Sequence, residues 1–384
     1  MSLKVLVISA AFGAGHIKAA EAVIEGFLEK KPEAEVIHID FGEFINRPLN
    51  STLKTTYIDM IKYTPKLWGK FYYKTADISA DSLFQRFLNG IGSRQFLKYI
   101  HSLQPDLIVC TYPVIAGVLS QLKKERRLHV PLATVVTDYG IHSQWVHQDV
   151  DLYLVGSEEV LEALVSRGIH RDRIKNTGIP VSMRFERQLD RQALMNQFGL
   201  KEQIPTVLIM GGAYGVMGGA TSICQMLAER EDPVQLIIVC GKDKQLYRSL
   251  KLLTSTSKHQ VLLFGFVRNV EELMTVSDLV ITKTGGLTVT EALTKHLPIV
   301  TYKPIPGQEK ENAEFLLKKG AGRIAYTEDQ LNRTINILLE NSEVREGMRI
   351  AASKVLPGRA AVRVVEHILE LYNPVGGQHN KQVS

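Results

Sequence analysis

The sequence lacks the features of a disulfide-rich secreted protein and of an integral membrane protein. Only three of its 384 residues are cysteines, Cys110, Cys224 and Cys240, and their spacing matches no metal site. Each lies in or beside an apolar run, so we expect buried free thiols in a reducing compartment. No stretch reaches the roughly 20 apolar residues that cross a bilayer, and the N-terminus shows no signal-peptide cleavage site. We therefore expect a cytoplasmic protein, or one attached to a membrane only from outside.

Two common nucleotide-binding motifs are also missing. The turn SAAFGAGHIKAA (9–20) contains Gly13 and Gly15, but Lys18 stands where the dinucleotide motif G-x-G-x-x-G needs its third glycine. The same turn lacks the G-K-[ST] of a P-loop. The formal charge of +6 and the pI near 9.0 are too mild to separate nucleic acid, anionic lipid and an anionic substrate as partners. The order of the segments along the chain is more informative than its composition.

Apolar, strand-like runs alternate with helical segments in both halves of the chain. The first half contains runs at 4–11, 35–41, 106–112, 132–138 and 151–157, and the second at 206–212, 234–241, 260–267, 278–286 and 297–304. Continuous apolar strands separated by helices predict parallel sheets covered on both faces. We therefore predict an α/β protein with two Rossmann-like doubly wound domains, whose ligand-binding edges face a shared cleft.

The domain boundary is predicted in a polar, helix-prone segment after Gly178. Residues 1–178 form the N-terminal domain, 179–205 the linker region and 206–357 the C-terminal domain. A helix at 358–373 follows a Pro-Gly stop, and its own pattern allows it to pack on either domain. We expect the polar tail 374–384 to be disordered.

The turn after the first strand places His16 at the start of a helix. Gly13 and Gly15 let the backbone approach a ligand, and the helix start offers N–H groups to an anion. His16 has two interpretations: a histidine that caps or packs locally, or a general base or polar group that touches an acceptor.

Glycine pairs follow two strands of the second half. Gly211 and Gly212 end the run at 206–212, and Lys283-Thr284-Gly285-Gly286 ends the run at 278–286 and leads into a helix. A helix that begins beside glycines predicts a diphosphate site. Glu291 in that helix either accepts hydrogen bonds from ribose hydroxyls or is a surface glutamate near the positive end of the helix dipole.

The loop after the next strand, KPIPGQEKENAEFL (303–316), is rich in hydrogen-bonding side chains. Gln308, Glu309 and Asn312 follow a Pro-Gly turn. Such groups suit the hydroxyls of a sugar, but Gln and Glu are also common in the first turn of any helix.

These loops together resemble those of the diacylglycerol glycosyltransferases, which include bacterial processive diacylglycerol glucosyltransferases and plant monogalactosyldiacylglycerol synthases. The resemblance runs through GAGHIKAA, VVTDYGIHSQWV (135–146), GIPV, MGG, GFV, SDLVITKTGGLTVTEAL and PGQEKENAEFL, and covers nearly the whole chain. A more distant relative is the N-acetylglucosaminyltransferase that completes the lipid-linked peptidoglycan precursor. The combination of loops is specific, although each loop alone is not.

The resemblance implies a GT-B fold and inverting transfer of a hexose from UDP-glucose or UDP-galactose to diacylglycerol, with no metal or other cofactor. It implies that the N-terminal domain binds the acceptor, that 358–373 packs back on this domain, and that the protein is peripheral to the inner face of the cell membrane. The matching positions are His16 for the base or acceptor contact, Glu291 for ribose, Gln308 and Glu309 for the sugar, Phe266 and Val267 for the backbone beside uracil, and Gly211 and Gly212 for phosphate.

Transfer without a metal is chemically reasonable for this set of residues. The helix dipole at Gly285 and Gly286, together with Lys283, can stabilise charge on a departing UDP. His16 or Asp138 is the candidate for taking the proton of the acceptor hydroxyl. Metal-dependent transferases usually carry Asp-x-Asp at the end of a strand. Asp149-Val-Asp151 fits that pattern but lies at the start of its strand, so we interpret it as chance.

Two further segments are candidates for the acceptor side. Residues 54–74 hold five lysines, six aromatic residues and one acidic residue, with Lys62, Lys66, Lys70 and Lys74 spaced every four residues around Trp68. Pro65 and Gly69 argue against one unbroken helix. This composition suits an anionic membrane interface, or a solvated basic face over packed aromatics. Trp145, in the loop 137–149, either contacts the acceptor or is structural.

Two other functions stay open from the sequence. One is a UDP-sugar transferase with a different lipid-linked or small acceptor, and the other is a non-catalytic nucleotide-sugar-binding protein. No recognised nucleic-acid-binding motif accompanies the basic segment, so nucleic acid is not a predicted partner.

Overall fold

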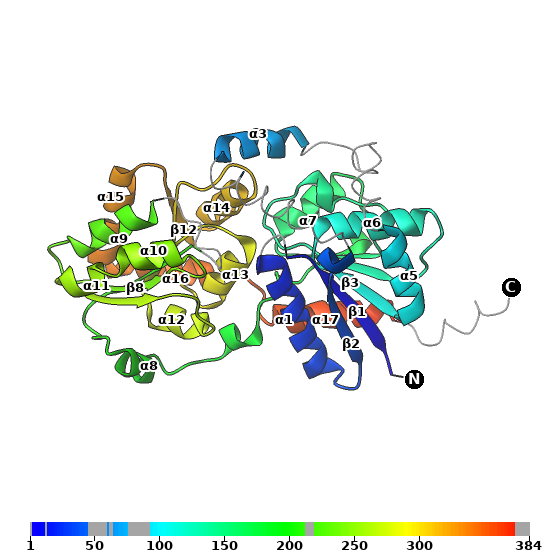
Figure 1. The fold of residues 1–384 in the computed structure, drawn as a ribbon, viewed down its shortest axis with the longest axis horizontal. Coiled ribbons are helices and arrows are strands. Elements are labelled where there is room, and N and C mark those ends of the chain that lie inside the picture. The colour runs from blue at the N-terminus through cyan, green and yellow to red at the C-terminus, as the bar shows by residue number, and fades with distance from the viewer. Residues whose placement is uncertain are drawn as a thin grey trace. The chain divides into compact units, whose positions relative to one another are not determined.

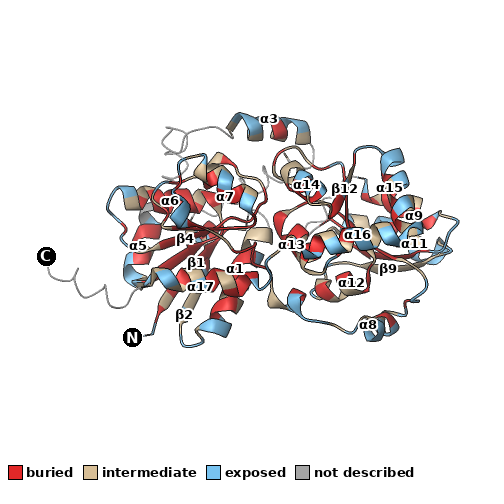
Figure 2. Cartoon of the chain, turned by 180° about the vertical axis from the view of Figure 1, so that it is seen from behind, coloured by how far each residue is buried: buried red, intermediate tan, exposed pale blue. Residues whose placement is uncertain are grey.

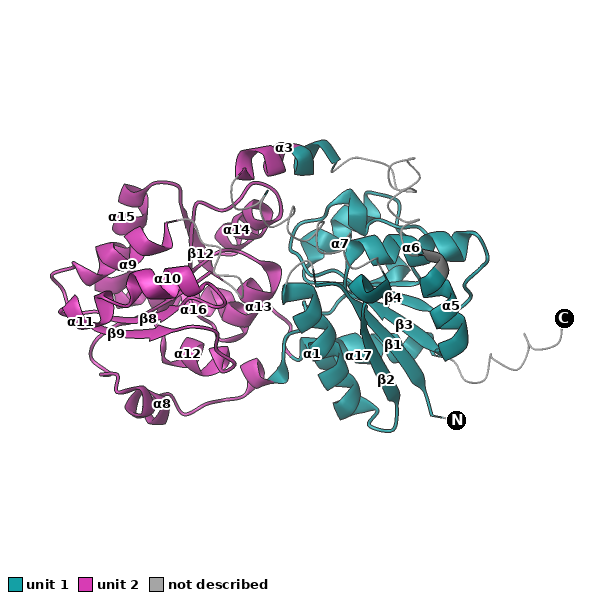
Figure 3. Cartoon of the chain, in the orientation of Figure 1, with its two compact units in different colours: residues 1–60, 71–183, 359–384 teal, residues 61–70, 184–358 magenta. Residues whose placement is uncertain are grey.

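The computed structural model describes residues 2–11, 14–44, 60, 64–75, 93–211 and 219–372. The chain divides into two compact units (Figure 3). Unit 1 comprises residues 1–60, 71–183 and 359–384, and unit 2 comprises residues 61–70 and 184–358. Four predictions concern positions outside the described residues, namely Gly13, Lys62, Gly212 and the tail 374–384.

Unit 1 is built on a six-stranded parallel sheet in the order β2-β1-β3-β4-β5-β6 (Figure 1). Its strands are β1 (Lys4–Ser9), β2 (Glu35–Asp40), β3 (Leu107–Cys110), β4 (Leu132–Val135), β5 (Leu152–Val155) and β6 (Ile174–Asn176). Its helices are α1 (Ala14–Lys30), α5 (Ser93–Leu103), α6 (Pro113–Lys124), α7 (Glu158–Val165) and α17 (Ala360–Leu371), with short 3-10 turns η1 (Phe41–Phe44), η2 (Ser143–Trp145) and η3 (Arg171–Arg173). A further turn, η4 (Met183–Glu186), begins at the end of unit 1.

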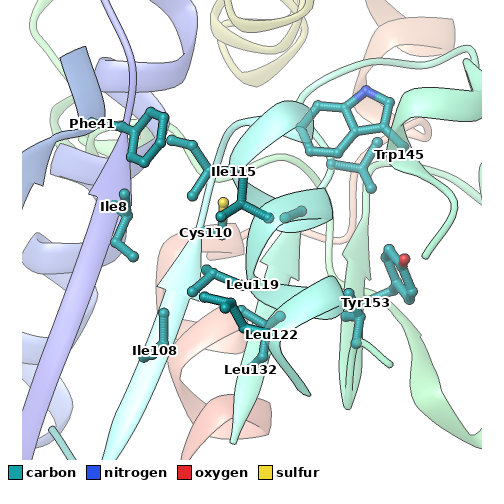
Figure 4. Close-up of a cluster of buried hydrophobic side chains, with 14 of the residues drawn as sticks. Ile8, Phe41, Ile108, Cys110, Ile115, Leu119, Leu122, Leu132, Trp145 and Tyr153 are labelled. Atoms are coloured by element: carbon teal, nitrogen blue, oxygen red, sulfur yellow. The ribbon is translucent and has the colours of Figure 1, made fainter. Parts of the chain in front are cut away.

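Successive residues of the strands point to opposite faces of this sheet, and both faces are covered. Val5 and Val7 pack with α1 and α17, while Leu6 and Ile8 pack with α5 and α6. Figure 4 shows the second cluster, in which Ile8, Ile108 and Trp145 lie around the side chains of α6. Burial on both faces explains why these strands read as continuous apolar runs (Figure 2).

Unit 2 contains the second six-stranded parallel sheet, in the order β12-β11-β10-β7-β8-β9. Its strands are β7 (Thr206–Met210), β8 (Gln235–Val239), β9 (Gln260–Phe264), β10 (Leu279–Thr282), β11 (Ile299–Tyr302) and β12 (Gly322–Ala325). Its helices are α8 (Arg191–Phe198), α9 (Ala220–Ala228), α10 (Lys244–Leu250), α11 (Leu253–Thr256), α12 (Val270–Val276), α13 (Gly286–Thr294), α14 (Gln308–Lys318), α15 (Glu328–Glu340) and α16 (Ser342–Ser353).

The predicted α/β class with two parallel, helix-covered sheets is confirmed. Ten strands were predicted, and the structure adds β6 and β12 at the edges of the two sheets. The C-terminal helix α17 belongs to unit 1, where it packs so closely on α1 that a Cβ atom on Gly26 would collide with the carbonyl group of Ala361.

Helix α3 (Pro65–Thr75) corrects one expectation about residues 54–74. Pro65 opens the helix, where a missing N–H group costs nothing, but Gly69 lies inside it without interrupting it. A Cβ atom at Gly69 would collide with the side chain of Pro306, so the close approach of these two residues explains the glycine.

Candidate functional site

Each sheet has one position where the order of its strands reverses direction. In unit 1, β2 lies on one side of β1 and β3 lies on the other, and in unit 2, β8 lies on one side of β7 and β10 lies on the other. At such a switch point the connecting loops diverge, so ligands bind beyond the carboxyl ends of the two strands. His16 follows β1, whereas Gly211 follows β7 and Lys283 follows β10. The predicted residues therefore lie at the two switch points.

His16 is held by residues from the neighbouring strands of unit 1. Its Nδ1 atom lies 2.8 Å from the carbonyl oxygen of Thr111, which follows β3. Its carbonyl oxygen accepts a 2.9 Å hydrogen bond from the Thr111 hydroxyl group. The Oγ1 atom of Thr137, beyond β4, lies 3.1 Å from the same Nδ1 atom. Because the Thr111 carbonyl group can only accept, Nδ1 carries the hydrogen and Nε2 keeps its lone pair.

Burial lowers the pKa of His16 from 6.5 to about 4, and the bond to the Thr111 carbonyl group opposes this only in part. The imidazole ring lies edge-on to Tyr112, with ring centroids 4.9 Å apart, and 6.2 Å from the ring of Trp145. His16 nevertheless remains partly exposed. The ring is therefore neutral at pH 7, with an Nε2 atom that can accept a proton.

Asp138, Trp145 and His147 lie on the loop beyond β4. Asp138 is buried, and no hydrogen bond joins it to His16. Trp145 is buried at 3% exposure and packs in the core of unit 1 as well as beside His16. His147 is also buried, and its Nε2 atom lies 2.7 Å from the carbonyl oxygen of Gln144. This loop thus fixes the surroundings of His16 from one side.

Two helices of unit 2 begin at the switch point without a side-chain cap. Helix α9 has Gly219 as its N-cap, and α13 has Gly285 as its N-cap. A Cβ atom at Gly285 would meet no atom within 4 Å, so the space beside this residue is open. The first N–H groups of a helix carry partial positive charge and need acceptors. The start of α13 can therefore bind an anion.

The loop before α13 is hydrogen-bonded to the first two turns of α14. Asn312 is fully buried, and its Nδ2 atom donates a 2.9 Å hydrogen bond to the carbonyl oxygen of Thr284. The hydroxyl group of Thr284 donates to the carbonyl oxygen of Glu309 at 2.5 Å. Gly307, the N-cap of α14, has φ of 102° and ψ of −138°, a conformation open essentially to glycine alone. These bonds hold the residues before the uncapped helix start in one arrangement.

Lys283 brings a positive charge to the same place. Its Nζ atom lies 3.4 Å from Oε1 of Glu309, whose other carboxylate oxygen accepts from the backbone N–H of Ile305 at 3.4 Å. The Lys283 side chain is 29% exposed and that of Glu309 14% exposed, so the pair lies at the border of the site. An incoming phosphate group would compete with Glu309 for the ammonium group.

The remaining predicted donor residues lie on the same side of the sheet of unit 2. Glu291 and Gln308 are partly exposed, on the second turn of α13 and the first residue of α14. Phe266 follows the edge strand β9, is 54% exposed, and has the Lys242 ammonium group 5.8 Å from its ring centroid. Val267 follows it. All of these residues follow carboxyl ends of strands, as a nucleotide site at this edge requires.

Helix α3 presents an exposed surface that is both basic and apolar. Lys66, Lys70 and Lys74 are exposed, and so are Leu67, Phe71 and Tyr73, whereas Trp68 is partly buried (Figure 2). At the end of the helix, Nε2 of His142 lies 3.1 Å from the carbonyl oxygen of Tyr72, and the Ser143 hydroxyl group donates to the carbonyl oxygen of Thr75 at 2.8 Å.

The Asp149-Val-Asp151 sequence has structural contacts. Oδ2 of Asp151 accepts a 2.7 Å hydrogen bond from the backbone N–H of Leu132 and lies 2.8 Å from Nζ of Lys123. Across the described ranges, no group of three or more His, Cys, Asp or Glu side chains is arranged to hold a metal ion. Among the same residues, no helix is both long and apolar enough to cross a membrane.

Comparison with known sequences identifies both halves of the chain. Residues 16–181 match the family described as Monogalactosyldiacylglycerol (MGDG) synthase, and residues 206–361 match Glycosyltransferase family 28 C-terminal domain. The processive diacylglycerol beta-glucosyltransferase of Bacillus cytotoxicus is 31% identical over 369 residues, covering 96% of this chain and 93% of the relative. The chain belongs to the diacylglycerol glycosyltransferase family.

A second relative supports this family, and two solved structures share the fold. The enzyme of the same name from Staphylococcus saprophyticus is 36% identical over 327 residues, covering 84% of this chain and 81% of the relative. Among solved structures, Acinetobacter baumannii MurG has a TM-score of 0.64 at 17% identity, covering 96% of this chain and 99% of the other. Anabaena Alr3699/HepE in complex with UDP-glucose has a TM-score of 0.55 at 15% identity, with 96% and 99% covered. The predicted GT-B fold and glycosyltransferase family are confirmed.

Sequence reasoning missed the two threonines that hold His16. Thr111 comes directly after β3 and Thr137 two residues after β4, and a polar residue just beyond a buried strand is the signal that could have pointed to them. Their partnership with His16 needs the order of the strands in the sheet, which the sequence alone does not supply.

Proposed function

We propose that this glycosyltransferase transfers glucose from UDP-glucose to the free hydroxyl group of diacylglycerol with inversion at the anomeric carbon. The two curated relatives described above are named as beta-glucosyltransferases acting on diacylglycerol, and together they support the choice of donor and acceptor. UDP-glucose carries its sugar in the α configuration, so a β-linked product requires attack from the opposite face. The central structural support is the uncapped start of α13 at the switch point of unit 2.

The donor half of the reaction needs stabilisation of the departing UDP. As the bond between the anomeric carbon and the phosphate oxygen breaks, its electron pair remains on UDP. The N–H groups at the start of α13 and the ammonium group of Lys283 meet this charge. Glu291 binds the ribose, Gln308 and Glu309 bind the sugar, and the backbone at Phe266 and Val267 lies beside uracil.

The acceptor half of the reaction needs a base. The neutral His16 ring accepts the proton of the diacylglycerol hydroxyl group at Nε2 while the hydroxyl oxygen bonds to the anomeric carbon. In this proposal Asp138, which is buried on the loop beyond β4, shapes the acceptor pocket and His16 is the base. Since peptide dipoles and Lys283 supply the positive charge, the reaction proceeds without a divalent cation.

The lipid acceptor places the reaction at a membrane surface. The exposed lysines of α3 attract anionic headgroups, and Leu67, Phe71 and Tyr73 insert beside them at headgroup depth. We therefore propose that α3 contacts the inner face of the cell membrane.

The test is transfer from radiolabelled UDP-glucose to diacylglycerol in anionic vesicles, with the product identified by mass spectrometry. We expect β-glucosyldiacylglycerol, undiminished activity in EDTA, and a lower kcat/KM with UDP-galactose. His16→Ala should lose about 10²–10⁴-fold in kcat while retaining its affinity for UDP. UDP binding without any turnover by the unsubstituted protein would instead indicate a nucleotide-sugar-binding protein. Transfer only to another acceptor would contradict the diacylglycerol assignment.

A further inference from the structure

The surroundings of His16 differ from those of a histidine base oriented by a carboxylate. Its Nδ1 atom has two oxygen neighbours, the carbonyl group of Thr111 at 2.8 Å and the hydroxyl group of Thr137 at 3.1 Å. Both neighbours are uncharged, and both threonines are buried, at 0% and 3% exposure. The ring is therefore oriented at two points by groups that carry no formal charge to favour its protonated form.

The charged and titratable side chains on the elements around His16 make contacts of their own. On α1, Lys18 pairs with Glu21 at 2.6 Å. Tyr112, beyond β3, contacts the imidazole edge-on through its ring. Asp138 follows Thr137 in the chain, and His142, the N-cap of the η2 turn, lies within hydrogen-bond distance of the carbonyl oxygen of Tyr72 in α3. In the described part of the chain, no charged side chain is hydrogen-bonded to the His16 imidazole.

We propose that Thr137 is a positioning residue that, with the Thr111 carbonyl group, holds His16 as the Nδ1-protonated tautomer and keeps its Nε2 atom available over an unusually wide pH range. The hydroxyl oxygen of Thr137 is the second acceptor of a bifurcated hydrogen bond that Nδ1–H donates. When Nε2 takes the acceptor proton, this oxygen and the Thr111 carbonyl oxygen stabilise the resulting cation by their dipoles. This inference rests on the proposed role of His16 as the base.

The consequence is that kcat/KM should fall at a lower pH than it does for an ordinary histidine base. A base is lost as the pH falls through its pKa, and burial lowers the pKa of His16 to about 4. We therefore expect kcat/KM to stay level between pH 8 and pH 5, where a solvent-exposed histidine would lose most of its activity. A carboxylate in place of the Thr137 hydroxyl group would favour the imidazolium ion and move the acid limb upward.

The test compares four variants at position 137 by pH–rate profiles and UDP binding. Thr137→Ser keeps the hydroxyl group and should behave like the unsubstituted protein. Thr137→Val keeps the shape but removes the acceptor, and should lower kcat about 10-fold, the rate equivalent of one hydrogen bond, with unchanged UDP affinity. Thr137→Asp should move the acid limb up by about one to two pH units, whereas the uncharged Thr137→Asn should not.

Histidine ¹⁵N chemical shifts give a readout independent of turnover. With His16 assigned by comparison with His16→Ala, the shifts at pH 7 should show hydrogen on Nδ1 and a lone pair on Nε2. The proposal is overturned if His16 carries its hydrogen on Nε2, if Thr137→Val matches Thr137→Ser, or if the Asp and Asn variants share one acid limb. Failure of the proposed function would look different, because His16→Ala would then retain full transfer or the unsubstituted protein would show none.

Discussion

The buried side chain of Asn312 in α14 donates a 2.9 Å hydrogen bond to the carbonyl oxygen of Thr284, and so joins the helix that follows β11 to the loop that follows the adjacent strand β10. This bond fixes the residues immediately before the uncapped start of α13. An anion site made of backbone N–H groups depends on such support, because its donors cannot be adjusted by rotating side chains. Asn312, predicted as a sugar ligand, thus has a structural partner in the loop before α13.

Replacing Asn312 by alanine tests this support. Asn312→Ala leaves the buried Thr284 carbonyl group without its donor, so we expect a loss of about 1–3 kcal/mol in the free energy of unfolding and about 10-fold weaker UDP binding. Urea denaturation and calorimetric titration measure the two effects. Thr294→Ala, at the opposite end of α13, is the matched control and should leave UDP affinity unchanged. Equal UDP affinity in Asn312→Ala and Thr294→Ala would contradict the role of this bond.

Glu291 is expected to recognise the ribose of the donor. The unsubstituted protein should bind UDP more tightly than 2′,3′-dideoxy-UDP, because hydrogen bonds from sugar hydroxyls to a carboxylate are each worth about 1.5–3 kcal/mol. Glu291→Ala should bind both nucleotides with the same, weaker affinity. If the variant still discriminates between them, another residue recognises the ribose. Competition with UDP-glucose would measure all four affinities in one assay.

His147 should make stability depend on pH. Burial lowers its pKa from 6.5 to about 4, although its hydrogen bonds to the carbonyl groups of Gln144 and Pro113 oppose this. Between these values the unfolded chain binds a proton that the folded protein does not, so the stability present above pH 6.5 is lost as the pH falls toward 4. The loss at pH 5 should be about 2 kcal/mol from this residue. Urea denaturation of His147→Gln at pH 7 and pH 5 should show a correspondingly smaller difference, and an unchanged difference would refute this origin.

The lysines of α3 should control vesicle binding. Lys66, Lys70 and Lys74 are exposed, and each lysine near an anionic membrane contributes about 1 kcal/mol, so the triple substitution to glutamine should weaken binding about 100-fold at low salt. Sedimentation with phosphatidylglycerol vesicles measures this change. A control triple variant at Lys244, Lys251 and Lys258, which are exposed in unit 2, should bind normally. Equal weakening in both variants would mean that net charge alone drives binding.

Much of the fold is visible in the sequence because the central strands are buried on both faces. Runs such as 206–212 and 278–286 contain β7 and β10 with few polar residues inside the strands. The strand β12, with the sequence GRIA, was not predicted. It lies at the edge of its sheet and includes an exposed arginine, so it lacks a continuous apolar run. The short edge strand β6, IKN, lacks an apolar run for the same reason.

The site is only partly visible in the sequence. Glycines beside helix starts are recognisable in the sequence, and they predict anion sites because the N–H groups at the start of a helix bind anions. The partners of His16 come from positions 95 and 121 residues away and depend on which strands are neighbours. Gly69 shows the same limit, because its place inside α3 is explained only by the proximity of Pro306. Contacts set by sheet order and close packing carry no periodic signal along the chain.

Location of bound UDP in crystals of the protein is the most direct test of the central claim that backbone N–H groups of unit 2 receive the departing nucleotide. The account predicts the diphosphate against the start of α13 beyond the carboxyl ends of β7 and β10, with the ribose hydroxyl groups on Glu291. A diphosphate bound elsewhere, or no nucleotide in this position at saturating UDP, would contradict it.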